Sequence, residues 1–359
     1  MSATSVITQT IPAPHLAVHV GDSLTHGYQQ PCTPGEMYPS RLRTLLQASG
    51  ANIRPYNQGI SGNTTSNMRG RMANFIQHGV PEVAFIFGGT NDTTAAAGTI
   101  AASPLPTTTG VSVGSGEGVK YSVGGWVVIN GQSRQLTSVS TDAIAWTTPI
   151  TLPSAGDAVY HDTSQNIQDI ANYLIAAGTD RVMVIGCAYV NYASGSGDYY
   201  SITTVSSATT SAITVPAISA GGTTLAADGY CVIGGEERLI SSITGAGPYV
   251  LNLSTPLTSA PAVGAAVTKS YAAHAAVRVK QKAAVTALTA ANPTKSIVYC
   301  DLHAHQLALI AAGTVAQGDD LAWYNFVGNY HFSSAGSLMC ANAVLAKINA
   351  TSGWLAALQ

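Results

Sequence analysis

One block of sequence occurs twice in this chain. Residues 125–139 (GWVVINGQSRQLTSV) match residues 229–243 (GYCVIGGEERLISSI) at a constant offset of 104 positions, without a gap. Two shorter matches follow in the same order: Thr-Pro-Ile-Thr with Thr-Pro-Leu-Thr, and Gly-Asp-Ala-Val with Gly-Ala-Ala-Val. Both copies are rich in Gly, Ser, Thr and Val, and their apolar residues alternate as in strands. We interpret the repeat as one small β module used twice.

The repeat determines how the rest of the chain is divided. It predicts inserted modules at residues 97–160 and 194–267, and a discontinuous core made of residues 1–96, 161–193 and 268–359. About 220 residues remain for the core, which is an ordinary size for one α/β domain.

The core segments alternate short apolar runs with helical patterns. Strands are expected at 15–21, 53–56, 82–87, 181–185 and 296–300, and helices at 38–47, 65–78, 163–177, 271–291 and 334–350. Strands that alternate with helices form a parallel sheet with helices on both faces. The ligand site of such a sheet lies at the carboxyl ends of its strands, so the modules, which follow two strands, should stand beside that site.

Composition excludes several classes of protein. Charged residues make up 9% of the chain and the net charge is −2. The few basic residues are scattered, so no nucleic-acid partner is expected. The apolar fraction of 46% argues against disorder. No apolar run reaches the ~18–20 residues of a membrane span, and the first residues lack the basic and apolar regions of a secretory signal peptide.

The cysteines are few and widely spaced. There are five, an odd number, and none forms a CxxC pair: Cys32, Cys187, Cys231, Cys300 and Cys340. This pattern predicts buried thiols and not a disulfide framework or a zinc site. No metal or organic cofactor is implied. The sparse charge and many small polar residues suit a secreted or virion-surface protein, and a cytoplasmic location stays open.

Four short segments carry chemistry. Gly21–Thr25 (GDSLT) directly follows the first strand, so the hydroxyl of Ser23 is expected at the sheet edge beside a helix N-terminus. Segments 57–64 (NQGISGNT) and 88–92 (GGTND) follow the second and third strands, and 330–336 (YHFSSAG) opens the last helix. Alone, Ser23 would be interpreted as a helix cap, but the four segments can converge on one crevice. Asp22 and Asp92 are expected to hold loops through hydrogen bonds.

With these segments the core resembles the SGNH hydrolases, also called GDSL esterases. The resemblance implies a flavodoxin-like, three-layer α/β/α core with a five-stranded parallel sheet, carrying the two β-rich modules as insertions. It implies that Ser23 is the nucleophile and His331 the general base. It also implies an oxyanion hole built from Ser23, Gly62 and Asn91, with Gly59 as the second candidate for the glycine.

The chemistry of this set is acyl transfer. A serine hydroxyl becomes a good nucleophile when a base removes its proton, and imidazole can do so near neutral pH. Two backbone N–H groups and an amide can then stabilise the oxyanion of the tetrahedral intermediate. The other histidines near the fifth strand, His303 and His305, are expected to be structural.

One position departs from the family pattern. The family has an aspartate three residues before the histidine, where this chain has Gly328. A backbone carbonyl near Gly328 could orient the imidazole, or an acid from elsewhere could do so: Asp301, Asp319 or Asp320. The protein could instead be a weak or inactive hydrolase. We favour a Ser–His dyad oriented by a carbonyl or an unusual acid.

The predicted function is a serine esterase or deacetylase. It would hydrolyse O-acyl esters, with O-acetyl favoured, on a bacterial surface or cell-wall polysaccharide, or on a small ester. The repeat resembles small β modules of bacteriophage tail proteins, which suggests a tail-associated esterase and a homo-oligomer such as a trimer. The alternatives are an inactive glycan-binding or structural virion protein on an esterase scaffold, and a lipase-type carboxylesterase. Against the lipase, no long apolar lid helix is evident, and Tyr (16) outnumbers Phe (5).

Overall fold

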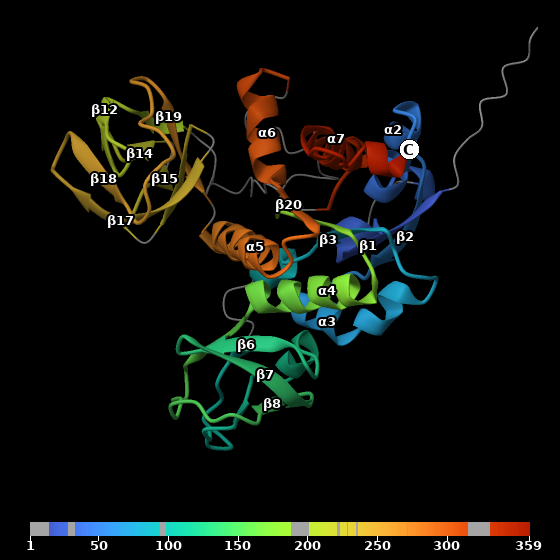
Figure 1. Ribbon diagram of the computed structural model, residues 1–359. Helices are drawn as coiled ribbons and strands as arrows, with labels where there is room; N and C mark the ends of the chain where they lie inside the picture. Colours follow the sequence, from blue (N-terminus) through green and yellow to red (C-terminus); the bar gives the residue numbers. More distant parts are fainter. Residues whose placement is uncertain are drawn as a thin grey trace, which may run out of the picture.

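The computed structural model describes residues 14–27, 33–93, 98–187, 201–220, 223–227, 229–234, 236–270, 272–314 and 331–359 (Figure 1). Its centre is a parallel sheet of five strands in the order β2-β1-β3-β10-β20. These strands are β1 (His15–Gly21), β2 (Ile53–Gly59), β3 (Val83–Phe87), β10 (Arg181–Ile185) and β20 (Ser296–Cys300). This is the flavodoxin-like order, and it confirms the predicted parallel α/β core.

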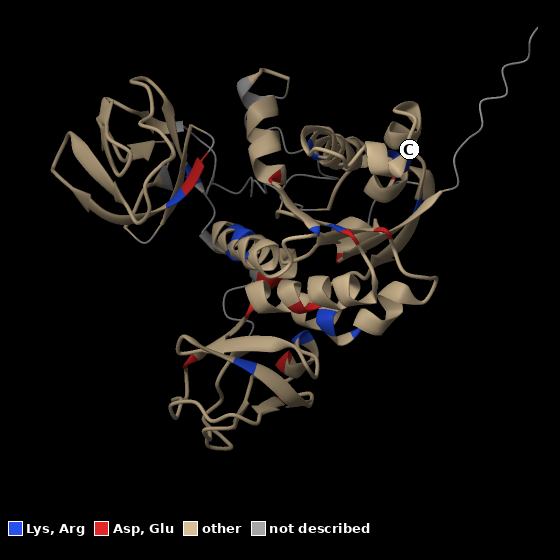
Figure 2. Cartoon of the chain, viewed as in Figure 1, with Lys and Arg blue, Asp and Glu red and all other residues tan. Residues whose placement is uncertain are grey.

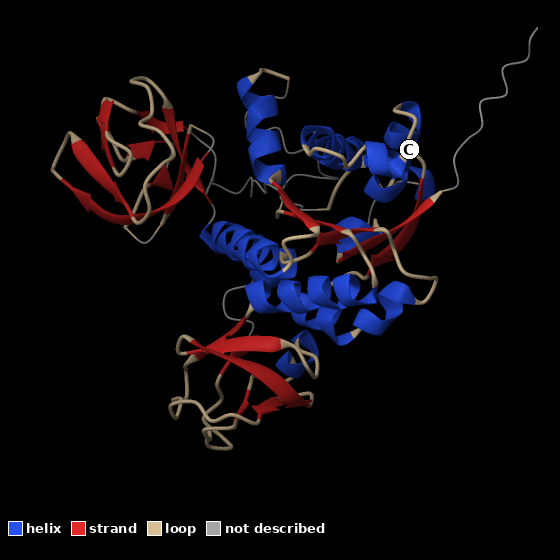
Figure 3. Ribbon diagram, in the orientation of Figure 1, coloured by secondary structure: helices blue, strands red, loops and turns tan. Residues whose placement is uncertain are grey.

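Helices cover both faces of the sheet (Figure 3). One face carries α2 (Tyr38–Ala48), α6 (Leu302–Ala311) and α7 (Ser334–Ala350). The other carries α3 (Thr65–Gly70), α4 (Thr163–Ala177) and α5 (Ala272–Ala291).

The strands between these layers bury residues on both sides. In β3, Phe85 and Phe87 pack with α2 and α7, whereas Ala84 and Ile86 pack with α4 and α5. A strand covered on both faces needs a continuous apolar run, which is why these short segments could be recognised from sequence.

Two helices differ from the sequence prediction. The segment expected as one helix at 65–78 divides at Gly70 into α3 and a 3₁₀ helix, Met72–Ile76. A Cβ at Gly70 would lie 2.7 Å from the Cβ of Ser122, so this position lets another part of the chain approach closely. Helix α6 falls where no element was expected. Its largely apolar sequence, LHAHQLALIA, shows little of the polar and apolar alternation that marks a surface helix.

The stretch between β3 and α4 forms an antiparallel sheet in the order β4-β9-β6-β7-β8-β5, which we call the first β sheet. Its strands are β4 (Gly98–Thr99), β5 (Gly110–Ser112), β6 (Trp126–Ile129), β7 (Gln132–Val139), β8 (Ala143–Trp146) and β9 (Ala158–His161). It has its own apolar core.

The stretch between β10 and α5 forms the second β sheet, in the order β11-β19-β16-β17-β18-β13-β12. Its strands are β11 (Ser201–Thr204), β12 (Ser207–Ala208), β13 (Ala212–Val215), β16 (Tyr230–Ile233), β17 (Glu236–Thr244), β18 (Tyr249–Leu253) and β19 (Ala266–Ser270). A small ladder, β14 (Ser219–Ala220) with β15 (Thr223–Thr224), lies beside it.

The two sheets share a detailed pattern. The register of β7 on β8 shifts between Leu136 and Ser138, and that of β17 on β18 shifts between Ile240 and Ser242, which are the repeat-related positions. The repeated arginine also has the same role: Nε of Arg134 donates to the carbonyl of Thr148 at 2.9 Å, and Nε of Arg238 to that of Pro256 at 3.0 Å. The exact domain boundaries stay a prediction.

Cys187, Cys231, Cys300 and Cys340 are buried free thiols, as predicted, and Cys32 lies outside the described residues. Charged side chains are sparse and dispersed over the described chain (Figure 2). No helix in that part of the chain is both long and apolar enough to cross a bilayer.

Candidate active site

The site predicted from sequence lies where the strand order of the sheet reverses. The chain runs from β1 outward to β2, then crosses back to β3 on the other side of β1. Gly21, at the end of β1, is in register with Gly59 of β2 and Phe87 of β3. The loops that follow all three strands therefore start at one level of one sheet edge, which is the position where open α/β sheets bind ligands.

Ser23 opens the short helix α1 (Ser23–His26) directly after β1. Asp22 caps this helix, because its Oδ1 accepts a hydrogen bond from the backbone N–H of Leu24 at 2.9 Å. The turn is tight: a Cβ at Gly21 would lie 2.6 Å from the carbonyl oxygen of Phe87. Strand and cap together fix the backbone that carries Ser23, whose side chain is buried.

The two candidate glycines, Gly59 and Gly62, lie in different surroundings. Gly59 is packed against α1, since a Cβ there would lie 2.2 Å from the backbone nitrogen of His26, and its N–H donates to Oδ1 of Asn57 at 2.9 Å. Gly62 has φ of 78° and open space around the position of a Cβ. Among the described residues its N–H has no hydrogen-bond acceptor. The geometry therefore favours Gly62 as an oxyanion donor.

Asn91 connects two of the loops. It lies in the 3₁₀ helix Thr90–Thr93 that follows β3, and its Nδ2 donates to the carbonyl of Asn63 at 2.9 Å. Asn63 is the neighbour of Gly62. Two of the predicted oxyanion donors, from loops after different strands, are thus brought next to each other.

Asp92 holds this loop to two helices. Its Oδ1 accepts from the N–H of Thr65 at 2.9 Å, and its Oδ2 accepts from the hydroxyl of Thr163 at 2.7 Å. Thr65 and Thr163 open α3 and α4. The predicted loop-holding role of Asp22 and Asp92 is confirmed. Burial, with a smaller contribution from the negative charge of Asp92, raises the pKa of Asp22 to about 7.

His331 is brought to the same edge of the sheet by its neighbour. Phe332 stacks on Phe87, the last residue of β3, with ring centroids 6.2 Å apart. The next segment is anchored as well, because the hydroxyl of Ser334 donates to Oε1 of Glu36 at 3.0 Å. His331 itself is 8% exposed, and burial lowers its pKa.

The partner that orients His331 was left open by the sequence. Gly328, Asp319 and Asp320 lie outside the described residues. Asp301 lies at the end of β20, where its Oδ1 accepts from the N–H of Ala304 at 3.0 Å and its Oδ2 pairs with Nζ of Lys282 at 2.8 Å. Both of its oxygens are therefore engaged, in capping α6 and in an ion pair.

His303 and His305 lie on α6, and burial lowers the pKa of both. A depressed pKa keeps them neutral near pH 7, as expected of structural histidines. Within the described ranges, no three His, Cys, Asp or Glu side chains are arranged to hold a metal ion.

Comparison with known proteins identifies a family for the chain. The sequence model of the GDSL-like lipase/acylhydrolase family matches residues 19–197, which include the segments that carry Ser23, Gly62 and Asn91. The chain belongs to this family. An arylesterase from Vibrio mimicus is 36% identical over 73 residues, which are 20% of this chain and 36% of the arylesterase. The matched part thus spans about a third of that relative.

Two solved structures are similar to this GDSL-like chain. The SGNH-hydrolase family esterase AlinE4 is 20% identical, with a TM-score of 0.29 over 49% of this chain and 61% of AlinE4. The lipase/acylhydrolase from Enterococcus faecalis is 14% identical, with a TM-score of 0.41 over 94% of this chain and 96% of that protein.

Sequence reasoning missed an arginine that supports the GDSL-like site. Nη2 of Arg71 donates to the carbonyls of Gly21 at 3.1 Å and Gln58 at 2.8 Å, the ends of β1 and β2. Its Nε donates to Oδ1 of Asn63 at 2.8 Å. One guanidinium thus binds two strand ends and the neighbour of Gly62. Burial lowers its pKa to about 10, so it stays charged at neutral pH.

A buried glutamine on α5 was also missed. Nε2 of Gln281 donates to the carbonyl of Gly88 at 2.7 Å, and its Oε1 accepts from the N–H of Cys187 at 3.1 Å. These backbone groups lie just after β3 and β10. The side chain therefore holds the start of the loop that carries Asn91. Nothing in the helical pattern of α5 distinguishes this position from an ordinary polar one.

The first β sheet packs against the helix that follows the Gly62 loop. The hydroxyl of Thr64 donates to the carbonyl of Lys120 at 2.8 Å. Nδ2 of Asn67 donates to the hydroxyl of Ser122 at 3.2 Å. The backbone N–H of Ser122 donates to the hydroxyl of Ser66, also at 3.2 Å. These contacts begin two residues after Gly62, so the first β sheet supports one wall of the site.

Proposed function

We propose that this protein is a serine ester hydrolase with Ser23 as nucleophile and His331 as general base. His331 removes the proton of the Ser23 hydroxyl as Oγ attacks the carbonyl carbon of the ester. The tetrahedral intermediate then collapses, the C–O bond to the alcohol breaks, and His331 returns the proton to that alcohol. Water, activated in the same way by His331, releases the acid from the acyl-serine.

The oxyanion of each intermediate would be stabilised by the N–H groups of Ser23 and Gly62 and by the Asn91 amide. The observation that carries this proposal is the bond from Asn91 to the carbonyl of Asn63, which joins the loops of two donors beside the start of α1. Donors fixed before the reaction need no reorganisation when charge develops, and removing one such donor costs about 3–4 kcal/mol of barrier in a well-studied protease.

We further propose that the natural substrate is an O-acetylated carbohydrate on a bacterial surface or cell wall. A chain with so few charges suits a neutral polymer, and the first β sheet lies against the helix that adjoins the proposed site. Association with a virion, and assembly as a trimer there, would bring such an enzyme to its substrate.

Hydrolysis of p-nitrophenyl acetate tests the chemistry. Ser23→Ala and His331→Ala should each lower kcat by about 10³-fold or more. His305→Ala, a matched histidine outside the proposed site, should keep the parent rate. If the unsubstituted protein is no faster than Ser23→Ala, the proposal is contradicted and a glycan-binding scaffold is favoured. That alternative is the one suggested by Gly328, which stands where the family has an orienting aspartate.

The substrate is tested separately by acetate release from O-acetylated polysaccharides, with long-chain p-nitrophenyl esters for comparison. Faster release from the polysaccharide supports the carbohydrate. A clear preference for the long acyl chain would instead indicate a lipase-type carboxylesterase.

A further inference from the structure

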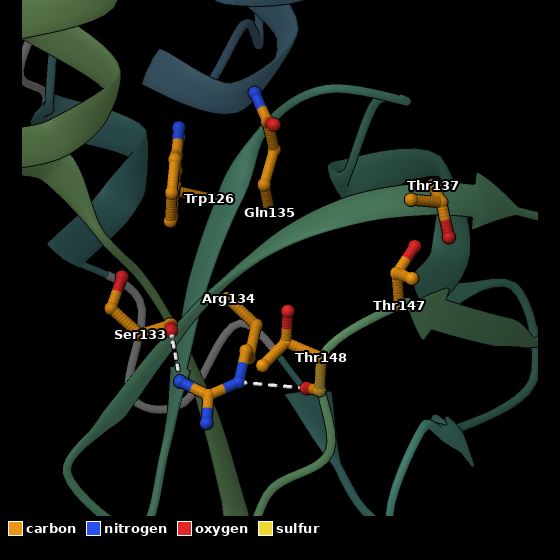
Figure 4. Close-up of a pocket in the computed structure, with 7 residues that line it drawn as sticks. All are labelled: Trp126, Ser133, Arg134, Gln135, Thr137, Thr147 and Thr148. Atoms are coloured by element: carbon orange, nitrogen blue, oxygen red, sulfur yellow. Dashed lines mark hydrogen bonds between the residues drawn. The ribbon is translucent and has the colours of Figure 1, made fainter.

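We propose that a pocket on the first β sheet is a second saccharide-binding site, which holds a neutral stretch of glycan while a neighbouring acetylated unit reaches Ser23. The choice of ligand rests on the proposed function. The pocket has a volume of about 320 Å³ and is lined chiefly by Trp126, Arg134, Gln135, Thr137, Thr147 and Thr148 (Figure 4). That volume is at the lower end of small-molecule sites, about 300–1,000 Å³, and suits a single sugar ring.

The indole of Trp126 is a fixed wall of this pocket. Its Nε1 donates to Oδ2 of Asp169 on α4 at 2.9 Å, and its backbone N–H donates to Oδ1 of Asn166 at 2.8 Å. Asp169 is itself held by Nε of Arg69 at 3.2 Å. A partly buried ring fixed in this way can offer an apolar surface, against which the C–H groups of a pyranose pack without ordering a mobile side chain.

The hydrogen-bond donors of the one charged residue in the lining are already used by the protein. Arg134 donates from Nε to the carbonyl of Thr148 at 2.9 Å and from Nη1 to the carbonyl of Ser133 at 2.6 Å (Figure 4). Its Nη2 donates to the carbonyl of Pro149 at 2.8 Å. The guanidinium keeps its positive charge, but its donors are directed at backbone oxygens, so Arg134 mainly shapes the pocket. The groups left to hydrogen-bond a ligand are therefore the neutral ones of the lining.

The remaining lining is made of neutral hydrogen-bonding groups. Thr137 and Thr147 come from β7 and from the segment after β8, both are exposed, and Figure 4 shows their hydroxyls on the same side of the pocket. The amide of Gln135 is held by a bond from Nε2 to the carbonyl of Gly124 at 3.1 Å. Hydroxyls and an amide around an aromatic face match the alternating hydroxyl and C–H surface of a sugar.

The second β sheet keeps part of the lining of this pocket, with Tyr230 in place of Trp126 and Ser254 in place of Thr147, but it changes two positions. Arg238 repeats the arginine, yet Leu239 stands at the position of Gln135 and Glu237 at that of Ser133. Glu237 is buried and pairs with Arg278 of α5, with Nε to Oε2 at 2.9 Å and Nη2 to Oε1 at 2.5 Å. In that sheet this position attaches the module to the core. We therefore expect saccharide binding at the first β sheet only.

The pocket is connected to two core helices, and one of them adjoins the proposed active site. Trp126 is bonded to α4, and the same sheet contacts the first turn of α3, next to the Gly62 loop. A polymer held there would raise the local concentration of its other acyl groups at Ser23, as a tethered ligand does.

The test is calorimetric titration of full-length Ser23→Ala protein with three unacetylated neutral oligosaccharides: chitotetraose, cellotetraose and xylotetraose. At least one should bind with Kd on the order of 1 mM or tighter. Thr147→Arg, which places a bulky side chain in the pocket from an exposed position, should weaken that binding by about tenfold or more. Ser254→Arg, at the repeat-related exposed position of the second sheet, should leave it unchanged. An unaltered Tm shows that both variants are folded.

Absence of binding by all three oligosaccharides overturns the inference, and so does binding that Thr147→Arg leaves unchanged. The Ser23-intact protein is assayed in parallel with p-nitrophenyl acetate, which does not need the pocket. Turnover without saccharide binding would refute the pocket and keep the esterase. Binding sensitive to Thr147→Arg without turnover would keep the pocket and refute the esterase.

Discussion

The ring of Phe332 stacks on the ring of Phe87 at a centroid distance of 6.2 Å and an interplanar angle of 28°. This contact joins the last residue of a central strand to the residue that follows His331. The proposed base thus reaches the sheet edge through its neighbour's packing, and Ser23 reaches it through the strand beside Phe87.

Phe332→Leu should lower kcat more than it lowers stability. The smaller side chain loses the ring contact and lets His331 move, and a displacement of about 1 Å can cost up to about 100-fold in rate. The variant is compared with Phe85→Leu, which removes a buried ring of β3 from the same apolar core. Similar loss of Tm with a larger loss of kcat in Phe332→Leu supports the positioning role, and equal kcat in both variants contradicts it.

Arg71→Met should reduce kcat by about 10–100-fold with little change in KM. The substitution removes the bonds to the carbonyls of Gly21 and Gln58 and to Asn63, so the Gly62 loop loses its anchor. Arg54→Met, at an exposed position of β2, is the control. A rise in KM with unchanged kcat would show that Arg71 acts on substrate binding and not on the oxyanion donors.

The pH profile should show an acid limb below the usual range of histidine. The general base works in its neutral form, and burial lowers the pKa of His331. The kcat/KM of the free enzyme should therefore fall only at a pH below about 6.5, the value of an unperturbed imidazole. An acid limb above that value would mean that a carboxylate or another anion stabilises the imidazolium.

The folded protein should lose stability as the pH falls below about 6.5. Among the described residues, burial depresses the pKa of six histidines, to about 3 for His19 and His274, with the pKa values of His161, His303, His305 and His331 also lowered. Between the unfolded and folded pKa values the unfolded chain binds more protons, so acid favours unfolding by about 1.4 kcal/mol per pH unit for each such group.

The buried Asp22 opposes this effect. Its pKa is raised to about 7, so it favours the folded state at low pH, but it is one group against six. The measurement is the urea midpoint at pH 7.5 and pH 5. His19→Gln should reduce the difference between the two midpoints, and an unchanged difference would show that His19 is not one of the groups responsible.

The attachment of the second β sheet should depend on its buried ion pair. Arg278 and Glu237 have side chains that are 1% and 5% exposed. Glu237→Gln should lower the free energy of unfolding by about 3–5 kcal/mol, because it leaves the guanidinium without its counter-charge. Asp180→Asn, which breaks the exposed pair with Lys295, should cost less than about 1 kcal/mol. Equal losses would mean that solvent screens both pairs.

The elements that could be predicted from sequence are those whose signal is local. The runs of β1, β10 and β20 are apolar because both faces are buried, and each strand begins and ends at the predicted residues. The four segments that carry the proposed site could be found because each directly follows a strand or opens a helix.

What could not be predicted depends on contacts between distant parts of the chain. Arg71 looks like an ordinary helical residue, and its role appears only when the ends of β1 and β2 lie beside it. Gly70, the last residue of α3, has no side chain at the place where Ser122, from the segment before β6, approaches it closely. Such close approaches leave no periodic pattern in the sequence.

The interrupted core also has a consequence for synthesis. Ser23 follows the first strand of the core, whereas His331 precedes its last helix, and both β sheets are translated between them. At roughly 5–20 residues per second, the ribosome needs on the order of 15–60 s to pass from one to the other. During that interval the nascent chain carries the proposed nucleophile without its proposed base. Hydrolytic activity at this site therefore cannot begin before His331 and the last helix of the core have been translated.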